Sequence, residues 1–511
     1  MLTITKKIGK LITSRVFIVG VSILLQLFLL VYTLLFLSAG RIYCYYFLHI
    51  ISALAVLYIV SRHDNPSYKI AWIIPIMFLP IVGGAFYFMF GNRRKTKQIR
   101  ERIDRYNNAK PDAGITATGC EDILRESNPM LARQADYIRN ISGFPSCCNT
   151  AAKYFSSGEE MYAAMKEELE KAEKFILMEY FIITPGEMWN SLLEILERKA
   201  NQGVHVLLMY DDMGCLTTFP NKYNEFLRKK GIMASAFNPF RPRLNVLMNN
   251  RDHRKICVID GNVGFTGGIN LADEYINKID RFGHWKDTGV MLKGDAVWNL
   301  TYMFLHLWDF GNNPHQLYDQ CKPTKSYPSD GFIQPFGDSP LDNVNVAETA
   351  YMQIINHAKN YVYITTPYLI LDNEMLTALI NAAQSGVDVR IITPKIPDKW
   401  YVHSVTRSFY QPLLEGGVKI YEYTPGFIHS KMFVCDDEVA LVGTANMDFR
   451  SFYLHFECGV SFYNSSIVHD VYNDILDTIE KSEEYTLEHC RSVGVVRQMG
   501  RMMLKVFAPL M

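Results

Sequence analysis

Residues 253–260 read HRKICVID, and residues 429–436 repeat the pattern as HSKMFVCD. Both copies place a lysine two residues after a histidine and an aspartate five residues after the lysine. Each copy is followed by a turn of small residues that ends in asparagine, 17 residues after the histidine in both cases. Because two independent accidents rarely share such spacing, we interpret the copies as a duplication. We expect them to form one site that contains two histidines and two lysines.

The residues between the lysine and the aspartate are apolar in both copies, which predicts a buried strand. On a strand, residues two apart point to the same face, whereas residues five apart point to opposite faces. The histidine and lysine of each copy should therefore act together, and the aspartates should have a structural role. The motif residues that form the predicted catalytic set are His253, Lys255, Asp260, His429, Lys431 and Asp436.

The chemistry that suits these residue types is transfer at a phosphate. Ammonium and amide groups can surround the non-bridging oxygens, and one neutral imidazole can attack phosphorus while the other, protonated, gives a proton to the leaving oxygen. The predicted phosphate-binding residues are Lys255, Asn270, Lys431 and Asn446. Each histidine then needs a carboxylate that orients it and sets its tautomer, and the candidates are Asp287 and Glu457.

A single His-x-Lys carries little information, because a buried histidine that is hydrogen-bonded to the backbone explains it as well. The complete tandem pattern, with asparagine at a matching distance, favours a shared active site over two structural histidines. No group of cysteine, histidine and carboxylate residues has the spacing of zinc ligands, and each motif histidine has a lysine nearby. We therefore predict no metal and no cofactor.

The two motifs lie in two segments, 151–335 and 336–492, which repeat one order of helices and strands. Each begins with a helical pattern, continues into an apolar run and a second helix, and reaches another strand after a glycine, Gly203 or Gly386. This alternation predicts two duplicated α/β domains with pseudo-twofold symmetry and a largely parallel sheet in each. A symmetry axis between the domains would bring the motifs face to face.

Residues 1–91 are strongly apolar and predict transmembrane helices, with apolar runs at 16–38, 44–61 and 70–90. The first run has no charge and can span a hydrocarbon core of about 30 Å. It is also longer than the apolar region of a typical signal peptide. Basic residues flank the segment on both sides, which favours the cytoplasm for both flanks and an even number of crossings. Three runs do not fit an even number, so the number of crossings stays open. We expect the catalytic region on the cytoplasmic face.

Three further stretches concern the membrane. Residues 92–150 form a basic juxtamembrane stretch and a connector, and the basic side chains suit anionic headgroups. The first half has about ten extra residues before its motif, within FNPFRPRLNVLMNN at 237–250. This stretch suits either an interfacial loop that admits acyl chains or a partly buried structural loop. The amphipathic tail 493–511 suits either an interfacial helix or a packed terminal helix.

The amino-acid composition excludes few classes of function. The chain has 511 residues, with 52 basic and 52 acidic side chains, so its net charge gives no support to a nucleic-acid partner. The ten cysteines form no C-x-x-C pair, and we expect them to be reduced and structural. They are Cys44, Cys120, Cys147, Cys148, Cys215, Cys257, Cys321, Cys435, Cys458 and Cys490.

Several long stretches resemble the phospholipase D superfamily, and more closely the bacterial cardiolipin synthases. They include NRDHRKICVIDGNVGFTGGINLADEY at 250–275, VGTANMDFRSFYLHFE at 442–457 and the apolar PSYKIAWIIPIMFLPIVGGAFYFMFGNR at 66–93. The resemblance extends over about residues 44–511. This chain departs from it at His455, where the family usually has asparagine, and by the additional run at 16–38. The first departure changes the packing expected near Glu457.

The resemblance implies two phospholipase-D-like domains and transphosphatidylation without a metal. One phosphatidylglycerol gives a phosphatidyl-histidine enzyme and glycerol, and the hydroxyl of a second attacks to give cardiolipin. Carried over to this chain, His253 is the nucleophile and His429 the general acid and then base, although the sequence does not fix the order. Asp287 and Glu457 orient the histidines. The implied partners are phosphatidylglycerol and other lipids of a bacterial cell membrane, with no nucleic acid, and homo-oligomerisation stays open.

Three alternatives use the same residues. Water in place of the lipid alcohol makes the protein a phospholipase D that releases phosphatidic acid. A membrane-anchored nuclease would need a basic groove with aromatic side chains, but the basic excess is confined to residues 93–105. A transferase with another donor or acceptor, such as phosphatidylethanolamine, is the third. Acyl-chain preference is not encoded in these motifs.

Overall fold

The computed structural model describes most of the chain. The described residues are 24, 39–63, 65–87, 91, 101, 103–104, 106, 119–220, 222–239, 249–312, 318–342 and 344–510. The chain divides into two compact units: a terminal unit of residues 1–101, 240–249 and 503–511, and a motif unit of residues 102–239 and 250–502. Nearly all of the predicted apolar run 16–38 lies outside the described residues, as do residues 240–248 of the extra loop.

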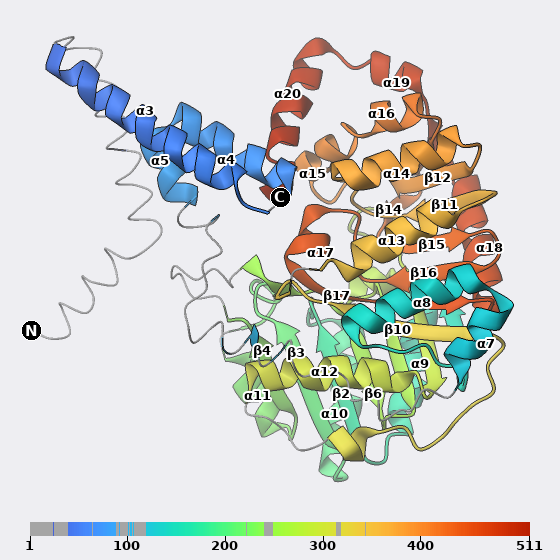
Figure 1. The fold of residues 1–511 in the computed structure, drawn as a ribbon. Coiled ribbons are helices and arrows are strands. Elements are labelled where there is room, and N and C mark those ends of the chain that lie inside the picture. The colour runs from blue at the N-terminus through green and yellow to red at the C-terminus, as the bar shows by residue number, and fades with distance from the viewer. Residues whose placement is uncertain are drawn as a thin grey trace, which may run out of the picture. The chain divides into compact units, whose positions relative to one another are not determined.

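The motif unit holds two large sheets whose strands follow the same order (Figure 1), besides a two-stranded sheet. The first is β1 (Thr150–Phe155), β9 (Gly289–Gly294), β7 (Val263–Gly267), β6 (Ile256–Ile259), β2 (Phe175–Tyr180), β3 (His205–Asp211) and β4 (Met233–Phe237). The second is β10 (Phe332–Asp338), β17 (His455–Tyr463), β16 (Val439–Gly443), β15 (Met432–Cys435), β11 (Tyr361–Thr365), β12 (Asp388–Pro394), β13 (Lys419–Tyr423) and β18 (Ser482–Tyr485). The first seven positions correspond strand for strand, as a duplication requires.

Both sheets are mixed, so the prediction of largely parallel sheets is wrong. Strands β2, β3 and β4 pair in parallel, but β6 pairs antiparallel with both β2 and β7. For β6 and β7 the reason is the short connection after the motif, where Asp260 and Gly261 have φ values of 51° and 69°. A tight turn of this kind can join only antiparallel strands. The same turn follows β15, where Asp436 has a φ of 52°.

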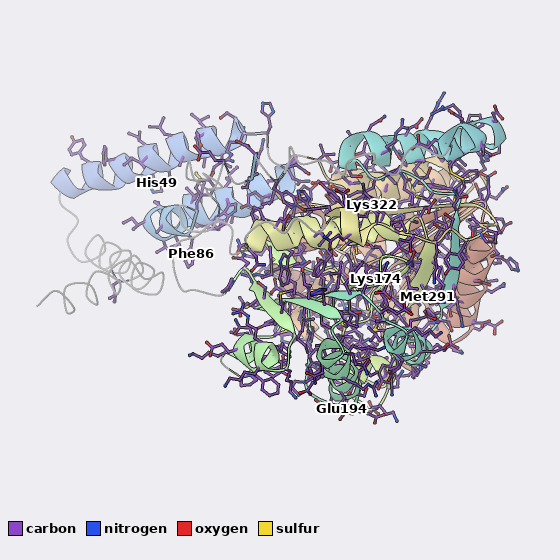
Figure 2. The ribbon with its side chains drawn as sticks, turned by 90° about the horizontal axis from the view of Figure 1, so that it is seen from below. His49, Phe86, Lys174, Glu194, Met291 and Lys322 are labelled. Atoms are coloured by element: carbon purple, nitrogen blue, oxygen red, sulfur yellow. A yellow bond between two sulfur atoms is a disulfide. The ribbon has the colours of Figure 1, made fainter. Side chains whose placement is uncertain are left out.

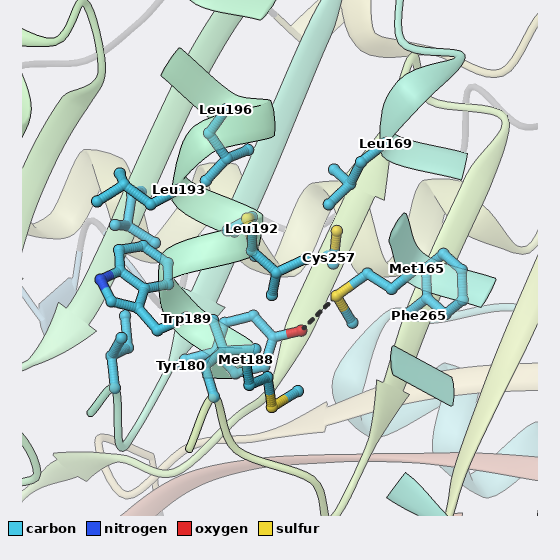
Figure 3. Packing of buried hydrophobic residues seen from close by; sticks show 14 of the residues in the cluster. Met165, Leu169, Tyr180, Met188, Trp189, Leu192, Leu193, Leu196, Cys257 and Phe265 are labelled. Carbon is cyan, nitrogen blue, oxygen red and sulfur yellow. Dashed lines mark hydrogen bonds between the residues drawn. The ribbon is translucent and has the colours of Figure 1, made fainter. Parts of the chain in front are cut away.

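The core of the first half forms where α9 (Gly158–Glu170) and α10 (Glu187–Asn201) pack on the sheet (Figure 3). Trp189, Leu192 and Leu196 recur three and four residues apart, so they form one buried apolar face of α10. Met165 meets this layer from α9, and the Tyr180 hydroxyl donates to its sulfur at 3.9 Å. On the opposite face of α10, Glu194 is exposed (Figure 2).

Further helices are described from residue 120 onward, and several of them pack on the sheets. They are α7 (Cys120–Ser127), α8 (Pro129–Ser142), α11 (Tyr223–Lys229), α12 (Val297–Gly311), α13 (Val346–His357), α14 (Asn373–Gln384), α15 (Trp400–Thr406), α16 (Tyr410–Glu415), α17 (Phe449–Tyr453), α18 (Ser466–Glu480), α19 (Leu487–Arg491) and α20 (Val495–Val506). Helix α12 packs on the first sheet and also on β10, while α18 packs on the second sheet and also on β1. Each half therefore helps to cover an edge strand of the other.

Two cysteines contradict the prediction that all ten are reduced. Cys120, at the start of α7, forms a disulfide with Cys148, just before β1. Their separation of 28 residues matches no short pairing motif, so only the folded chain brings them together. Among the other described cysteines, Cys147, Cys215, Cys257, Cys321, Cys435 and Cys458 are free and buried, and Cys490 is free and half-buried.

The terminal unit contains α3 (Ala39–Val60), α4 (Pro66–Phe78) and α5 (Pro80–Phe86). The predicted run 44–61 lies almost wholly in α3, and the run 70–90 is broken at Leu79, where the chain leaves α4 with a φ of −133°. A small core of Ile59, Trp72 and Ile76 joins these helices. Among the described helices, none combines the length and apolarity that a membrane crossing needs.

Candidate functional site

Each motif histidine lies just before a central strand, rather than on it. His253 follows the two-residue strand β5 (Arg251–Asp252), and His429 follows β14 (Gly426–Ile428). Strand β5 pairs with β17 of the second half, and β14 pairs with β8 (His284–Lys286) of the first. The segment that carries each histidine is therefore hydrogen-bonded to the opposite half.

This exchange gives each histidine a carboxylate from the other half. The backbone N–H of His253 donates to the Phe456 carbonyl at 2.9 Å, and its Nδ1 bonds to the next residue, Glu457, at 2.9 Å. The backbone N–H of His429 donates to the carbonyl just before Asp287, and its Nδ1 bonds to Asp287 at 2.7 Å. Both predicted carboxylates therefore lie beside the histidines. Because each Nδ1 faces a carboxylate, Nε2 is the ring atom available to a substrate.

The protonation of the two histidines follows from burial. Burial lowers the pKa of His253 to about 3, with Lys255 and His455 acting in the same direction and Glu457 opposing them. Burial and Lys431 lower the pKa of His429 to about 4, against the effect of Asp287. Both imidazoles are therefore neutral near pH 7, which is the state that a nucleophile needs.

The carboxylates stay charged despite their burial. Burial raises the pKa of Glu457, but the neighbouring His253 outweighs it and holds the pKa well below its usual range. Burial also raises the pKa of Asp287, but the neighbouring His429 outweighs this effect and holds the pKa below its usual value. A charged carboxylate accepts the Nδ1 proton and stabilises positive charge that develops on the ring.

The two motif lysines are buried and lie against their own histidines. The Lys255 ammonium donates to the His253 carbonyl at 2.5 Å, and the Lys431 ammonium donates to the His429 carbonyl. Burial lowers the pKa of Lys255 to about 8 and that of Lys431 to about 7. The charge of Lys255 also lowers the pKa of His429, so the two motifs share one electrostatic environment.

The two asparagines differ. Asn270 accepts from the backbone N–H of Ile182 at 3.0 Å and donates to the Tyr275 hydroxyl at 2.8 Å, which leaves one amide N–H for a phosphate. The buried Oδ1 of Asn446 has no hydrogen-bond partner within the described part of the chain. Asn446 therefore has more unused hydrogen-bonding capacity than Asn270.

The motif aspartates bind backbone groups. Asp260 accepts from three consecutive N–H groups before and at the start of β2, at 2.7–2.9 Å, and Asp436 does the same before and at the start of β11, at 2.6–2.8 Å. This geometry matches the structural role expected from their strand face. Asp260 and Asp436, although placed in the predicted catalytic set, thus bind backbone N–H groups, and neither has a hydrogen bond to a motif histidine or lysine among the described residues.

Sequence reasoning missed a buried ion cluster behind the first motif. Arg254, between the motif histidine and lysine, donates through Nε to Glu179 at 2.6 Å and lies 3.5 Å from Asp252. All three side chains are buried. Removing one member of such a cluster costs about 3–5 kcal/mol, because it leaves an uncompensated buried charge. The only signal in the sequence was a charged residue inside an otherwise buried motif.

A group of ligand-type side chains lies at the first motif. The candidate ligand atoms of His253, His455 and Glu457 lie within 4.8 Å of one another. The buried ammonium of Lys255 lies on the same segment and opposes a divalent cation there. We therefore assign these side chains to acid–base chemistry and assign no metal to them.

Comparisons with known proteins agree with this geometry. The family model described as "Cardiolipin synthase, PLD-like domain" matches residues 165–284 and 351–478, and one described as "Phospholipase D-nuclease N-terminal" matches residues 50–92. A cardiolipin synthase of Geobacillus thermodenitrificans is 37% identical over 83% of this chain and 86% of its own. An uncharacterized protein of Streptococcus mutans is 42% identical over 89% of this chain and 99% of its own.

The fold has a counterpart among solved structures. A phosphatidylserine synthase of Haemophilus influenzae superposes with a TM-score of 0.57 over 75% of this chain and 98% of its own, at 14% identity. This likeness concerns the fold alone, whereas the sequence relatives and the two matched domains concern the family. The chain belongs to the cardiolipin synthase family of the phospholipase D superfamily.

Proposed function

We propose that the protein is a cardiolipin synthase that passes a phosphatidyl group from one phosphatidylglycerol to the hydroxyl of a second. The observation that carries this proposal is the crossed pairing, in which each neutral histidine bonds to a buried carboxylate of the other half. Two equivalent imidazoles suit a reaction with two similar half-reactions. The curated relatives named cardiolipin synthase support the choice of substrate.

In the first half-reaction, Nε2 of His253 attacks phosphorus, and the bond from phosphorus to the glycerol headgroup oxygen breaks. His429 gives a proton to that oxygen, so glycerol leaves as a neutral alcohol. The free protein holds His429 neutral, but the anionic phosphodiester raises its pKa as it binds and lets it take the proton. Lys255 and Lys431 hold the non-bridging oxygens, together with Asn446 and the remaining N–H of Asn270.

In the second half-reaction, the terminal hydroxyl of another phosphatidylglycerol takes the place of glycerol. The neutral His429 accepts its proton, the alkoxide oxygen bonds to phosphorus, and the bond from phosphorus to Nε2 of His253 breaks. The products are cardiolipin and the starting enzyme. Water in place of the lipid hydroxyl would give phosphatidic acid instead.

We place the protein at the membrane of a bacterial cell, with the apolar runs of residues 1–91 as transmembrane segments and the motif unit on the cytoplasmic face. The match to an N-terminal domain at residues 50–92 supports the attachment. Seven lysines and arginines between residues 93 and 105 support the cytoplasmic side. In this arrangement 92–150 is the basic connector, 151–335 and 336–492 are the two repeats, and 493–511 is the tail.

The test uses the full chain in lipid nanodiscs with phosphatidylglycerol labelled in its acyl chains and, separately, in its headgroup glycerol. We expect cardiolipin and free glycerol in equal amounts, and a loss of about 10²–10⁴-fold in His253→Ala and His429→Asn. His403→Asn, which changes a half-buried histidine of α15, is the matched control. Phosphatidic acid as the main product would assign hydrolysis, and full activity in either variant would remove the two-histidine mechanism.

A further inference from the structure

A third histidine lies in the site and has no role in the steps above. His455 is the first residue of β17 and is 9% exposed. Neither of its ring nitrogens has a hydrogen-bond partner among the residues that the structure describes. A buried polar group without a partner costs about 1–3 kcal/mol, so its presence needs an explanation.

The nearest polar group is the carboxylate that serves His253. Nδ1 of His455 lies 3.7 Å from Oε1 of Glu457, and the same oxygen accepts from Nδ1 of His253 at 3.0 Å. His455 and Glu457 are two apart on one strand, so their side chains project to the same face. The other oxygen, Oε2, also accepts from the Thr444 hydroxyl. The two imidazoles thus lie on one carboxylate, with their ring centres 5.6 Å apart.

The other half lacks this feature at the matching position. Trp285 precedes Asp287 by two residues, as His455 precedes Glu457. The Trp285 and His429 rings are 5.5 Å apart and inclined at 45°, while the His455 and His253 rings are 5.6 Å apart and inclined at 44°. The duplicated positions therefore hold rings in nearly the same place. An indole cannot compete for Asp287 as an imidazole can for Glu457.

We propose that His455 is a positioning residue that divides the charge of Glu457 between two imidazoles and so keeps His253 neutral as the nucleophile. His429, whose carboxylate is undivided, then takes the proton. The inference rests on the proposed function for its mechanism, but it concerns the protonation of one histidine. At 3.7 Å from Oε1, Nδ1 of His455 is too far away for a hydrogen bond, but the dipole of a proton on it would draw charge away from the hydrogen bond that stabilises a protonated His253.

The charge of a protonated His455 also favours the neutral form of His253. His455 lowers the pKa of His253, and it lowers the pKa of Asp448, the residue before α17, against the burial that raises it. The titratable groups recorded beside His455 are Glu457 on its own strand, His253 on the adjoining segment and Asp448 just before α17. Lys255 acts on His253, and Arg450 acts on Asp448. Glu457 also accepts from the Thr444 hydroxyl, but His253 and His455 are the two imidazoles beside it.

The experiment compares the wild type with His455→Asn and His455→Gln by the ratio of kcat/KM at pH 3 to that at pH 7, because the pKa of His253 is about 3. Without His455, Glu457 serves His253 alone, and the pKa of His253 rises. More His253 is then protonated and unreactive at pH 3, so we expect the ratio to fall about twofold for a rise of half a pKa unit. His403→Asn, outside the site, should leave the ratio unchanged.

A second readout does not depend on turnover. With ¹³C-labelled histidine, the Cε1 resonance of His253, assigned by its loss in His253→Ala, should titrate at higher pH in His455→Asn than in the wild type. An unchanged titration, or equal loss of rate at both pH values, would overturn the proposal and leave His455 a packing residue. If the wild type makes phosphatidic acid rather than cardiolipin, the proposed function fails, but the pH ratio and the titration still decide the role of His455.

Discussion

At the scale of single residues, the carboxylate behind each histidine should control the rate rather than substrate binding. Glu457 bonds to Nδ1 of His253 and lies on the far side of that ring from Nε2. We expect Glu457→Gln to lower kcat about 10²–10⁴-fold with little change in KM, because a neutral amide cannot stabilise the positive charge that develops on the ring. Initial rates with labelled phosphatidylglycerol at saturating and limiting concentrations measure the two constants separately.

The matched control for this substitution is Asp260→Asn, which also replaces a carboxylate by an amide. Asp260 binds three backbone N–H groups outside the cluster of histidines and lysines. We expect it to lower the free energy of unfolding by about 1–3 kcal/mol, seen as a lower Tm, while kcat stays close to that of the wild type. A loss of kcat equal to that of Glu457→Gln would return Asp260 to the reacting groups.

The lysines predict the alkaline limit of activity. Burial lowers the pKa of Lys431 to about 7 and that of Lys255 to about 8. Only the ammonium form attracts a phosphate, so kcat/KM should fall as the pH rises from 7 to 9. In Lys431→Arg the side chain keeps its charge throughout this range. The fall of kcat/KM with pH should then move to higher pH, towards the pKa of Lys255 at about 8. An alkaline limb at the same pH in both proteins would exclude Lys431 as its source.

At the scale of elements, the sequence predicts the motif strands well and their pairing poorly. Strands β6 and β15 are buried as their apolar residues indicate, because each lies at the centre of a sheet. Local periodicity contains no information about partners, however, so neither the antiparallel hairpins nor the pairing of β5 with β17 could be read from it. That pairing decides which carboxylate meets which histidine. The two carboxylates could be proposed from the sequence, but their crossing could not.

Helix α20 has exposed apolar side chains. Val495, Val496, Met499 and Met502 are 59–86% exposed. Arg497 and Gln498 between them are exposed as well, and Arg501 is half-buried. A lipid surface suits such a helix, because apolar side chains gain from burial in it and the helix has no acidic residue to repel anionic headgroups. We expect the double substitution V496D/M499D to reduce the rate on vesicles several-fold and leave the rate on short-chain soluble lipid unchanged. Gln498→Asp adds a negative charge to the same helix and should affect neither rate; equal losses on both substrates would contradict the prediction.

At the scale of the whole molecule, duplication explains why the site could be recognised without a structure. One ancestral segment supplied a histidine and a lysine twice, and the fixed interval of 17 residues to each asparagine survives in both copies. Contacts between segments that are distant in the sequence do not produce a repeated pattern of this kind. The Cys120–Cys148 disulfide and the placement of His455 on a shared carboxylate each depend on the folded chain.

The side of the membrane on which the motif unit lies is a property of the whole molecule, and two features favour opposite sides. The basic residues between 93 and 105 favour the cytoplasm, whereas disulfides such as Cys120–Cys148 are typical of oxidising compartments. Following the basic residues, we expect the exposed Ser492→Cys, in a Cys490→Ser background, to resist a membrane-impermeant maleimide in intact cells and to react after lysis. Labelling in intact cells would instead place the motif unit outside, where the disulfide is stable, and would require an odd number of crossings if the N-terminus stays in the cytoplasm.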